Sequence, residues 1–159
     1  MLEVLDLRTC FFIGHRDSDD AVSGLLAQEV ERHITEYGVT DLIVGHYGRF
    51  DRMAAIAVME ARARHPEISL TLLLPYHPTE RPVELPPGYD RALYPPGMET
   101  VPKRLAILRA NRWALARSDF LIAYVSHPSS GSREVLEAAL RRQKRGLIRV
   151  TNLAGWYPI

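Results

Sequence analysis

The residues best suited to chemistry lie in residues 118–140, where an apolar run, a small-residue turn and a helical pattern follow one another. The turn contains Ser129, Ser130, Gly131 and Ser132. A loop of this kind at the start of a helix leaves backbone N–H groups without helical partners, and the helix dipole adds positive charge. Such groups bind anions, so the stretch predicts a phosphate site. The alternative is a tight turn in which Ser132 caps the helix.

A second turn follows the apolar run at residues 9–13 and consists of Gly14, His15 and Arg16. Glycine allows a ligand to approach the backbone closely, and an arginine can bind a phosphate through two parallel hydrogen bonds. The turn therefore predicts a second phosphate contact. The alternative is that Gly14 only shapes the turn and Arg16 is a solvated charge.

A third turn contains Gly45 and Gly48, followed by Arg49 and Asp51. It could hold a ribose or a phosphate, with Asp51 accepting a hydrogen bond from a sugar hydroxyl. The alternative is that Asp51 caps the following helix. The glycine spacing differs from the GxGxxG fingerprint of dinucleotide-binding folds. We therefore expect no resident dinucleotide or other cofactor.

Three carboxylates are candidates for catalysis: Asp51, Glu99 and Glu134. Each could serve as a general base or stabilise positive charge during cleavage of a sugar bond. Glu134 also lies where a carboxylate favours a helix dipole, which is a structural reason for its presence. Arg112 is a further candidate, because its predicted helix could direct it toward a ligand cleft.

Four histidines fall in loops that follow predicted strands. They are His15, His46, His77 and His127. No HxE or HExxH spacing accompanies them, so the sequence predicts no metal site.

These side chains need a scaffold, and the hydrophobic pattern predicts one. Short apolar runs typical of buried strands alternate with segments of helical spacing. The predicted strands are residues 9–13, 41–44, 69–74, 120–125 and 147–150, with a short one near 92–94. Four helices are predicted: one that ends near Tyr37, one that ends at Pro66, and two that cover residues 101–117 and 133–143. Such alternation favours an α/β fold: a single-domain, Rossmann-like, doubly wound and mainly parallel sheet of five to six strands with helices on both faces.

In such sheets ligands bind beyond the carboxyl ends of the strands. All three glycine turns follow predicted strands, so we expect them to converge there. A proline-rich loop over residues 75–98 interrupts the pattern, and a loop of this length is usually functional or poorly ordered.

Composition limits the remaining possibilities. The 159 residues fit one domain over 1–159, and the single Cys10 rules out a disulfide within the chain. The net charge is +1, so we expect nucleic acid to be an improbable partner. There is no membrane span and no secretory signal pattern, which together predict a cytoplasmic protein.

Three segments carry a resemblance to a known family: Phe12-Ile13-Gly14-His15-Arg16, Gly48-Arg49-Phe50-Asp51-Arg52-Met53, and residues 94–113. Together with the strand at residues 118–125, they resemble bacterial and phage proteins of the SLOG superfamily over most of the chain, from about residue 9 to 150. That superfamily includes the DNA-uptake protein DprA and the "lonely guy" phosphoribohydrolases. The resemblance implies a Rossmann-like fold, a nucleotide or nucleotide-derived ligand, and a homodimer.

Catalytic members of the superfamily carry a PGGxGTxxE motif. The matching turn here, residues 129–135, lacks the double glycine, and Val135 stands at the position of the glutamate. Glu134 comes one residue earlier, about 100° away around a helix. The sequence therefore favours a binding module, a sensor or sequestering protein for a nucleotide-derived ligand, over a hydrolase of the nucleotide N-glycosidic bond.

Overall fold

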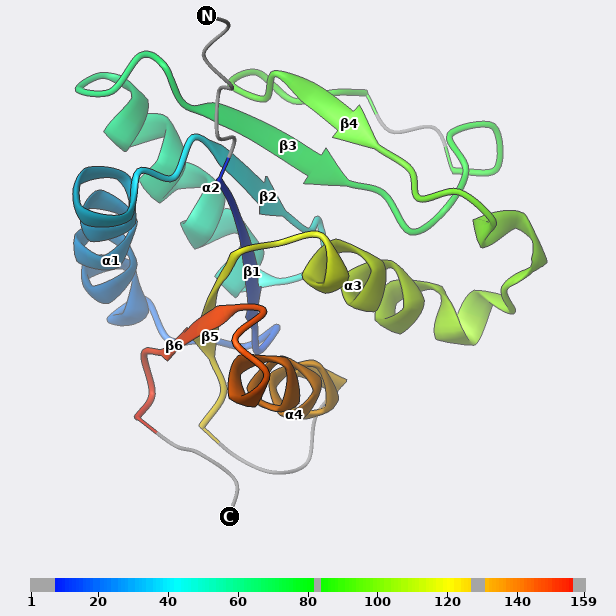
Figure 1. Ribbon diagram of the computed structural model, residues 1–159. Coiled ribbons are helices and arrows are strands. Elements are labelled where there is room, and N and C mark those ends of the chain that lie inside the picture. The colour runs from blue at the N-terminus through cyan, green and yellow to red at the C-terminus, as the bar shows by residue number, and fades with distance from the viewer. Residues whose placement is uncertain (1–7, 82–83, 127–130, 156–159) are drawn as a thin grey trace, which may run out of the picture.

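Six short segments pair into one parallel sheet, in the order β4-β3-β2-β1-β5-β6 (Figure 1). The computed structural model describes residues 8–81, 84–126 and 131–155. The strands are β1 (Thr9–Gly14), β2 (Asp41–Val44), β3 (Ser69–Leu73), β4 (Arg91–Leu93), β5 (Phe120–Tyr124) and β6 (Arg149–Asn152). Every pairing between neighbours is parallel. The predicted α/β, Rossmann-like fold is therefore confirmed.

In the part of the chain that the structure describes, four helices cover the two faces of this sheet. They are α1 (Val22–Tyr37), α2 (Arg49–Arg62), α3 (Ala106–Ala116) and α4 (Gly131–Lys144), and two short 3₁₀ turns, η1 (Met98–Thr100) and η2 (Lys103–Leu105), precede α3. In Figure 1, α1 and α2 lie on one face and α3 and α4 on the other. None of the helices in the described part of the chain is both long and apolar enough to span a bilayer.

Successive residues of β1 explain the two layers, because side chains of a strand alternate between faces. Cys10 and Phe12 pack in the core beneath α1 and α2. Phe11 and Ile13 pack in the core beneath α3 and α4. β1 is therefore buried on both sides, as its continuous apolar run predicts.

The direction in which the strands are added reverses beside β1. β2, β3 and β4 extend the sheet to one side of it, whereas β5 and β6 extend it to the other. The loops that follow β1 and β5 therefore diverge, which leaves a crevice at the carboxyl ends of these two strands.

Several element boundaries differ from the sequence-based expectation. α3 begins at Ala106 rather than near residue 101, because Pro102 precedes a 3₁₀ turn. β6 begins two residues later than predicted, since Gly146 adopts a left-handed conformation (φ 72°) and Leu147 stays exposed. α2 ends at Arg62, before Pro66.

The proline-rich connection between β3 and β4 is anchored where it returns to the sheet. Arg62 of α2 donates to the Gly88 carbonyl and to Oδ2 of Asp90, each at 2.7 Å. The backbone N–H of Leu70 in β3 donates to that same Asp90 oxygen at 2.7 Å. These contacts fix the entry into β4, the short edge strand.

Candidate functional site

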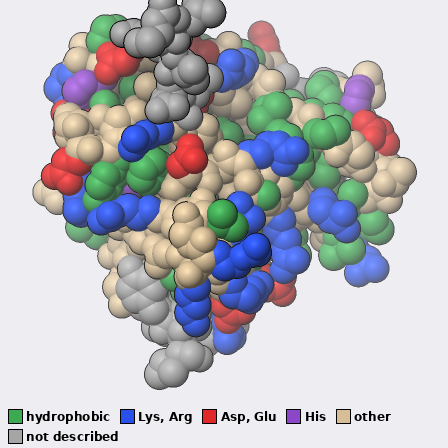
Figure 2. Space-filling model, in the orientation of Figure 1, with side chains coloured by type: hydrophobic (Ala, Val, Ile, Leu, Met, Phe, Trp, Pro, Cys, Tyr) green, Lys and Arg blue, Asp and Glu red, His purple; other side chains and the backbone are tan. Residues whose placement is uncertain are grey.

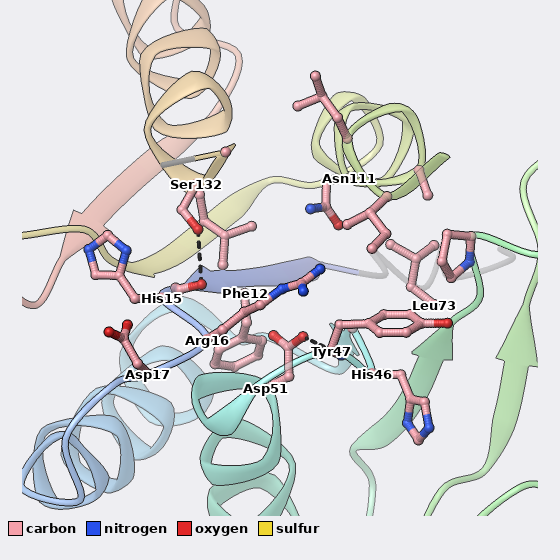
Figure 3. A pocket seen from close by; sticks show the side chains of 18 of the residues that line it. Phe12, His15, Arg16, Asp17, His46, Tyr47, Asp51, Leu73, Asn111 and Ser132 are labelled. Atoms are coloured by element: carbon pink, nitrogen blue, oxygen red, sulfur yellow. Dashed lines mark hydrogen bonds between the residues drawn. The ribbon is translucent and has the colours of Figure 1, made fainter. Parts of the chain in front are cut away.

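A cavity of about 520 Å³ lies at the carboxyl end of β1, beside the point where strand order reverses (Figure 3). Its walls come from the loop after β1, the loop after β2, α3 and the first residues of α4. The location is the one that the topology of an open parallel sheet favours for a ligand.

All three glycine turns singled out in the sequence contribute to this cavity. The predicted residues that line it are Gly14, His15, Arg16, Gly45, Asp51, Gly131 and Ser132. Residues more than 110 positions apart in the chain therefore meet in one place.

Other predicted residues lie elsewhere. Gly48 is the N-cap of α2 and Arg49 is its first residue; neither lines the cavity, and Arg49 forms an ion pair with Asp20. Arg112 and Glu134 are exposed on α3 and α4 and do not line the cavity, and Glu99 borders a separate hollow beside Tyr94. Ser129, Ser130 and His127 lie outside the described residues.

The start of α4 is tied directly to the end of β1. The Ser132 hydroxyl donates to the Gly14 carbonyl at 2.9 Å, a bond drawn in Figure 3. Gly14 itself packs against Phe50 of α2, and a Cβ added at this glycine would overlap the phenyl ring. Glycine is therefore required here by close packing between two elements.

His15 connects the loop after β1 to the end of β5. Its side chain is buried, and its Nε2 accepts a hydrogen bond from the backbone N–H of Ser126 at 2.9 Å. Because a backbone N–H is always the donor, Nε2 must carry a lone pair, which places the proton of the neutral ring on Nδ1. His15 therefore positions the loop that carries Arg16.

The carboxyl group of Asp51 lines the cavity and has a raised pKa. The backbone N–H of Tyr47 donates to its Oδ2 at 3.1 Å, and Gly45 lies so close that an added Cβ would be 2.7 Å from that oxygen. Burial raises the pKa of Asp51 to about 7, and the Tyr47 N–H and the positive charge of Arg16 offset only part of this effect. A carboxyl group that titrates near neutrality can both give and take a proton.

Figure 3 shows how the charged groups are arranged around Asp51. Arg16 extends into the cavity above the carboxyl group, and Ser132 lies beyond it on the far wall. Tyr47 lies on the opposite side, with its ring toward Leu73. The cavity thus offers a guanidinium at its centre, a helix start on one side and an aromatic ring on the other.

The sequence reading missed Arg104, Asn111 and Tyr47, all of which line the cavity. Arg104 and Asn111 are seven residues apart, and the lining residues Ile107 and Leu108 complete an i, i+3, i+4, i+7 pattern. That spacing is typical of one side of a helix and could have identified Arg104 and Asn111 from the sequence.

The histidines do not form a cluster. Within the described residues, no group of three or more His, Cys, Asp or Glu side chains is placed to hold a metal ion. His15 and His46 line the cavity, whereas His77 packs edge-on against Tyr94, with ring centroids 5.2 Å apart.

Comparison with known proteins supports the fold of this chain. No protein-family model and no curated protein sequence matches the chain. A solved structure of DNA processing protein A (DprA) from Helicobacter pylori, described for its single-stranded DNA binding mode, is similar with a TM-score of 0.58 and 18% identity. The match covers 90% of this chain, which spans only 64% of that one.

Two molybdenum-cofactor proteins are also similar. The molybdenum cofactor binding protein of Rippkaea orientalis matches with a TM-score of 0.56 and 14% identity, over 94% of this chain and 91% of that one. The molybdenum cofactor carrier protein of Chlamydomonas reinhardtii matches with a TM-score of 0.55 and 16% identity, over 93% and 92%. These similarities show a shared fold; the similar proteins themselves bind a molybdenum cofactor or single-stranded DNA.

Proposed function

We propose that the cavity binds a nucleotide or nucleotide-derived small molecule, and that the chain is a sensor or sequestering module of the SLOG superfamily. The observation that supports this best is the meeting of three glycine turns around one cavity that Arg16 enters. The phosphate would lie at the start of α4, where the first N–H groups of a helix lack helical acceptors. Arg16 and Arg104 would neutralise its charge.

The rest of the ligand would lie toward Asp51 and Tyr47. Asp51 would bind a sugar hydroxyl, and the Tyr47 ring would contact the base, since aromatic rings stack on nucleobases without strong sequence preference. A molybdenum cofactor, the ligand named for two similar structures, is an alternative small molecule to test at the same site. From chain length and composition we also propose one domain over residues 1–159 and a cytoplasmic location. From the family resemblance we propose a homodimer, which light scattering would test.

Substitution of Gly131 tests the phosphate site. A Cβ added at Gly131 meets nothing within 4 Å, so Gly131→Ala and Gly131→Asp should both fold. An aspartate at a helix start favours the helix dipole but repels a phosphate. We therefore expect Gly131→Asp to keep or raise the melting temperature of the free protein while abolishing the shift caused by a ligand.

The measurement is thermal unfolding with mono- and dinucleotides, ADP-ribose, cyclic nucleotides and inorganic phosphate. A ligand at a hundred times its Kd stabilises by about 2.7 kcal/mol, or roughly 5–10 °C for a chain of this size. Gly131→Ala is the control and should retain the shift. Mass spectrometry of small molecules that co-purify with the protein would identify the ligand. An unchanged melting temperature across the panel, with no co-purified molecule, would contradict the proposal.

A second candidate is a hydrolase of the nucleotide N-glycosidic bond, favoured by Asp51 and its pKa of about 7. In that reaction Asp51 would take a proton from water as the water attacks the anomeric carbon. The bond between that carbon and the base nitrogen would break, and the base would leave with the bonding electron pair and take up a proton from solvent. Asp51→Asn should then abolish release of free base from nucleoside monophosphates. Glu99→Gln and Glu134→Gln should not, since neither carboxylate lines the cavity. If wild-type protein at high concentration releases no base, this candidate is wrong.

A further inference from the structure

The net charge of +1 conceals a strong separation of charge along the chain. Residues 101–159 contain eleven Lys or Arg and three Asp or Glu, whereas residues 1–100 contain nine and sixteen. With histidine neutral, the two parts carry +8 and −7. The basic part supplies α3 and α4 together, so its charge is concentrated on one layer of the fold.

This layer carries many basic side chains. α3 and α4 lie side by side on the same face of the sheet, and Lys and Arg side chains gather over them in Figure 2. We define the basic face by six exposed side chains: Arg109, Arg112, Arg117, Arg141, Lys144 and Arg145.

The charges of the basic face are available to a partner, unlike those of the opposite layer. No carboxylate in the described ranges forms an ion pair with any of the six. On the α1–α2 side, by contrast, Arg32 pairs with Glu36 and Arg64 pairs with Glu31, each at 3.0 Å. Most arginines of the α1–α2 layer are therefore held in ion pairs, whereas the six cations of the basic face are not.

The apolar residues of these two helices are used in the core. Ala110 and Ala114 of α3 and Leu136 of α4 are buried against the sheet. The large aromatic ring on this side, Trp113, is partly buried and lies beneath the Arg117 guanidinium, 4.0 Å from the ring centroid. Because helices that bind bilayers need an apolar side to insert, the basic face suits a polyphosphate better than a membrane.

We propose that the basic face is a docking surface for the phosphate backbone of a nucleic acid. α3 has 11 residues and α4 has 14, so the two helices are roughly 16 and 21 Å long. Phosphates of one strand are about 3.4 Å apart along a duplex, so a row of about five matches the length of α3, along which Arg109, Arg112 and Arg117 lie. Five of its six cations are arginines, which bind phosphate oxygens in pairs. The net charge, on which the expectation of no nucleic acid rested, hides this surface.

The test is fluorescence anisotropy with a 20-base-pair duplex, a 20-nucleotide single strand and, separately, co-sedimentation with anionic phosphatidylserine vesicles. With about five phosphate contacts, affinity should fall by several hundredfold between 50 and 200 mM salt. The variant Arg141→Gln/Lys144→Gln/Arg145→Gln should bind at least tenfold more weakly at 50 mM salt. Its salt dependence should also be shallower, by about two to three in the logarithmic slope.

A matched control removes the same charge from the other layer. Arg32→Gln/Arg52→Gln/Arg64→Gln lowers the net charge equally and should bind like the wild type. If the first triple variant fails to fold, Arg109→Gln/Arg112→Gln on α3 gives a second measurement, with an expected loss of about fivefold. Equal losses in the two triple variants, or binding to vesicles but to neither nucleic acid, would overturn the proposal. Gly131→Asp should bind nucleic acid normally, so this surface and the cavity can fail independently.

Discussion

Asp51 carries a carboxyl group whose ionisation opposes folding. Its pKa rises from 3.8 to about 7 on folding, chiefly through burial. Between these two values the folded state binds more protons than the unfolded state, so stability falls as pH rises from about 4 to about 7 and is constant above that range. We expect Asp51→Asn to remove this loss, because an asparagine oxygen can still accept from the Tyr47 N–H.

Chemical denaturation of both proteins at pH 4.5 and pH 8 measures the effect. The variant should gain on the order of 3 kcal/mol over wild type at pH 8 and much less at pH 4.5. His33 is fully buried, and burial lowers its pKa, so it destabilises the fold in acid. That contribution is the same in both proteins and cancels in the difference. Parallel curves across the pH range would show that Asp51 is ionised without penalty.

Sequence reasoning at this scale found the three turns that border the cavity but not the helix side chains that complete its wall. Glycines and small residues report a turn locally, so Gly14, Gly45 and Gly131 could be found without a structure. Which side of a helix meets the cavity depends instead on how the helix packs on the sheet. Asn111 and Arg112 are neighbours about 100° apart on α3, and packing directs Asn111 to the cavity.

At the scale of elements, the start of α2 and the loop after β1 hold each other in place. The Arg49 N–H donates to the Arg16 carbonyl at 2.9 Å. Gly48 has φ 123°, and a Cβ there would lie 2.7 Å from the Cα of Arg16. Both the conformation and the backbone contact exclude a side chain, so this glycine sets the position of Arg16 without lining the cavity.

We therefore expect Gly48→Ala to destabilise the protein by on the order of 1–3 kcal/mol and to weaken ligand binding. Gly24→Ala is the matched control. Gly24 lies exposed within α1, and a Cβ there meets nothing within 4 Å, so alanine should stabilise by about 1 kcal/mol. Thermal unfolding compares the two variants. Equal stability of Gly48→Ala and wild type would show that the loop can move aside.

Element boundaries show where local sequence information ends. α1 ends at Tyr37, and the next residue, Gly38, is left-handed (φ 68°). A glycine at this position predicts the end of a helix from the sequence alone. β6 was placed too early, because Leu147 and Ile148 are apolar and resemble a strand. Its register is instead fixed by Asn152, whose side chain bonds to the N–H and the carbonyl of Val125, each at 3.0 Å. Val125 lies 27 residues before Asn152, so no pattern in the sequence near Asn152 predicts this contact.

For the whole molecule, the alternation of strands and helices was sufficient to predict the class of fold. It could not predict the strand order, because the placement of β5 beside β1 depends on packing between distant segments. The distribution of charge over the surface likewise depends on packing between distant segments. The net charge of +1 gives no sign of the basic face, whereas the packing of α3 beside α4 brings its separate arginines onto one layer of the fold.

The central position of β1 determines when the cavity can exist. The first strand of the chain pairs on one side with β2, which follows within about thirty residues, and on the other with β5. Contacts that complete the cavity join Ser126 to His15 and Ser132 to Gly14, across 111 and 118 residues. On a ribosome, α1 and the first three strands can therefore assemble while the pocket is still unformed. The proposed binding site is therefore complete only after β5 has inserted beside β1 and α4 has packed against the end of β1.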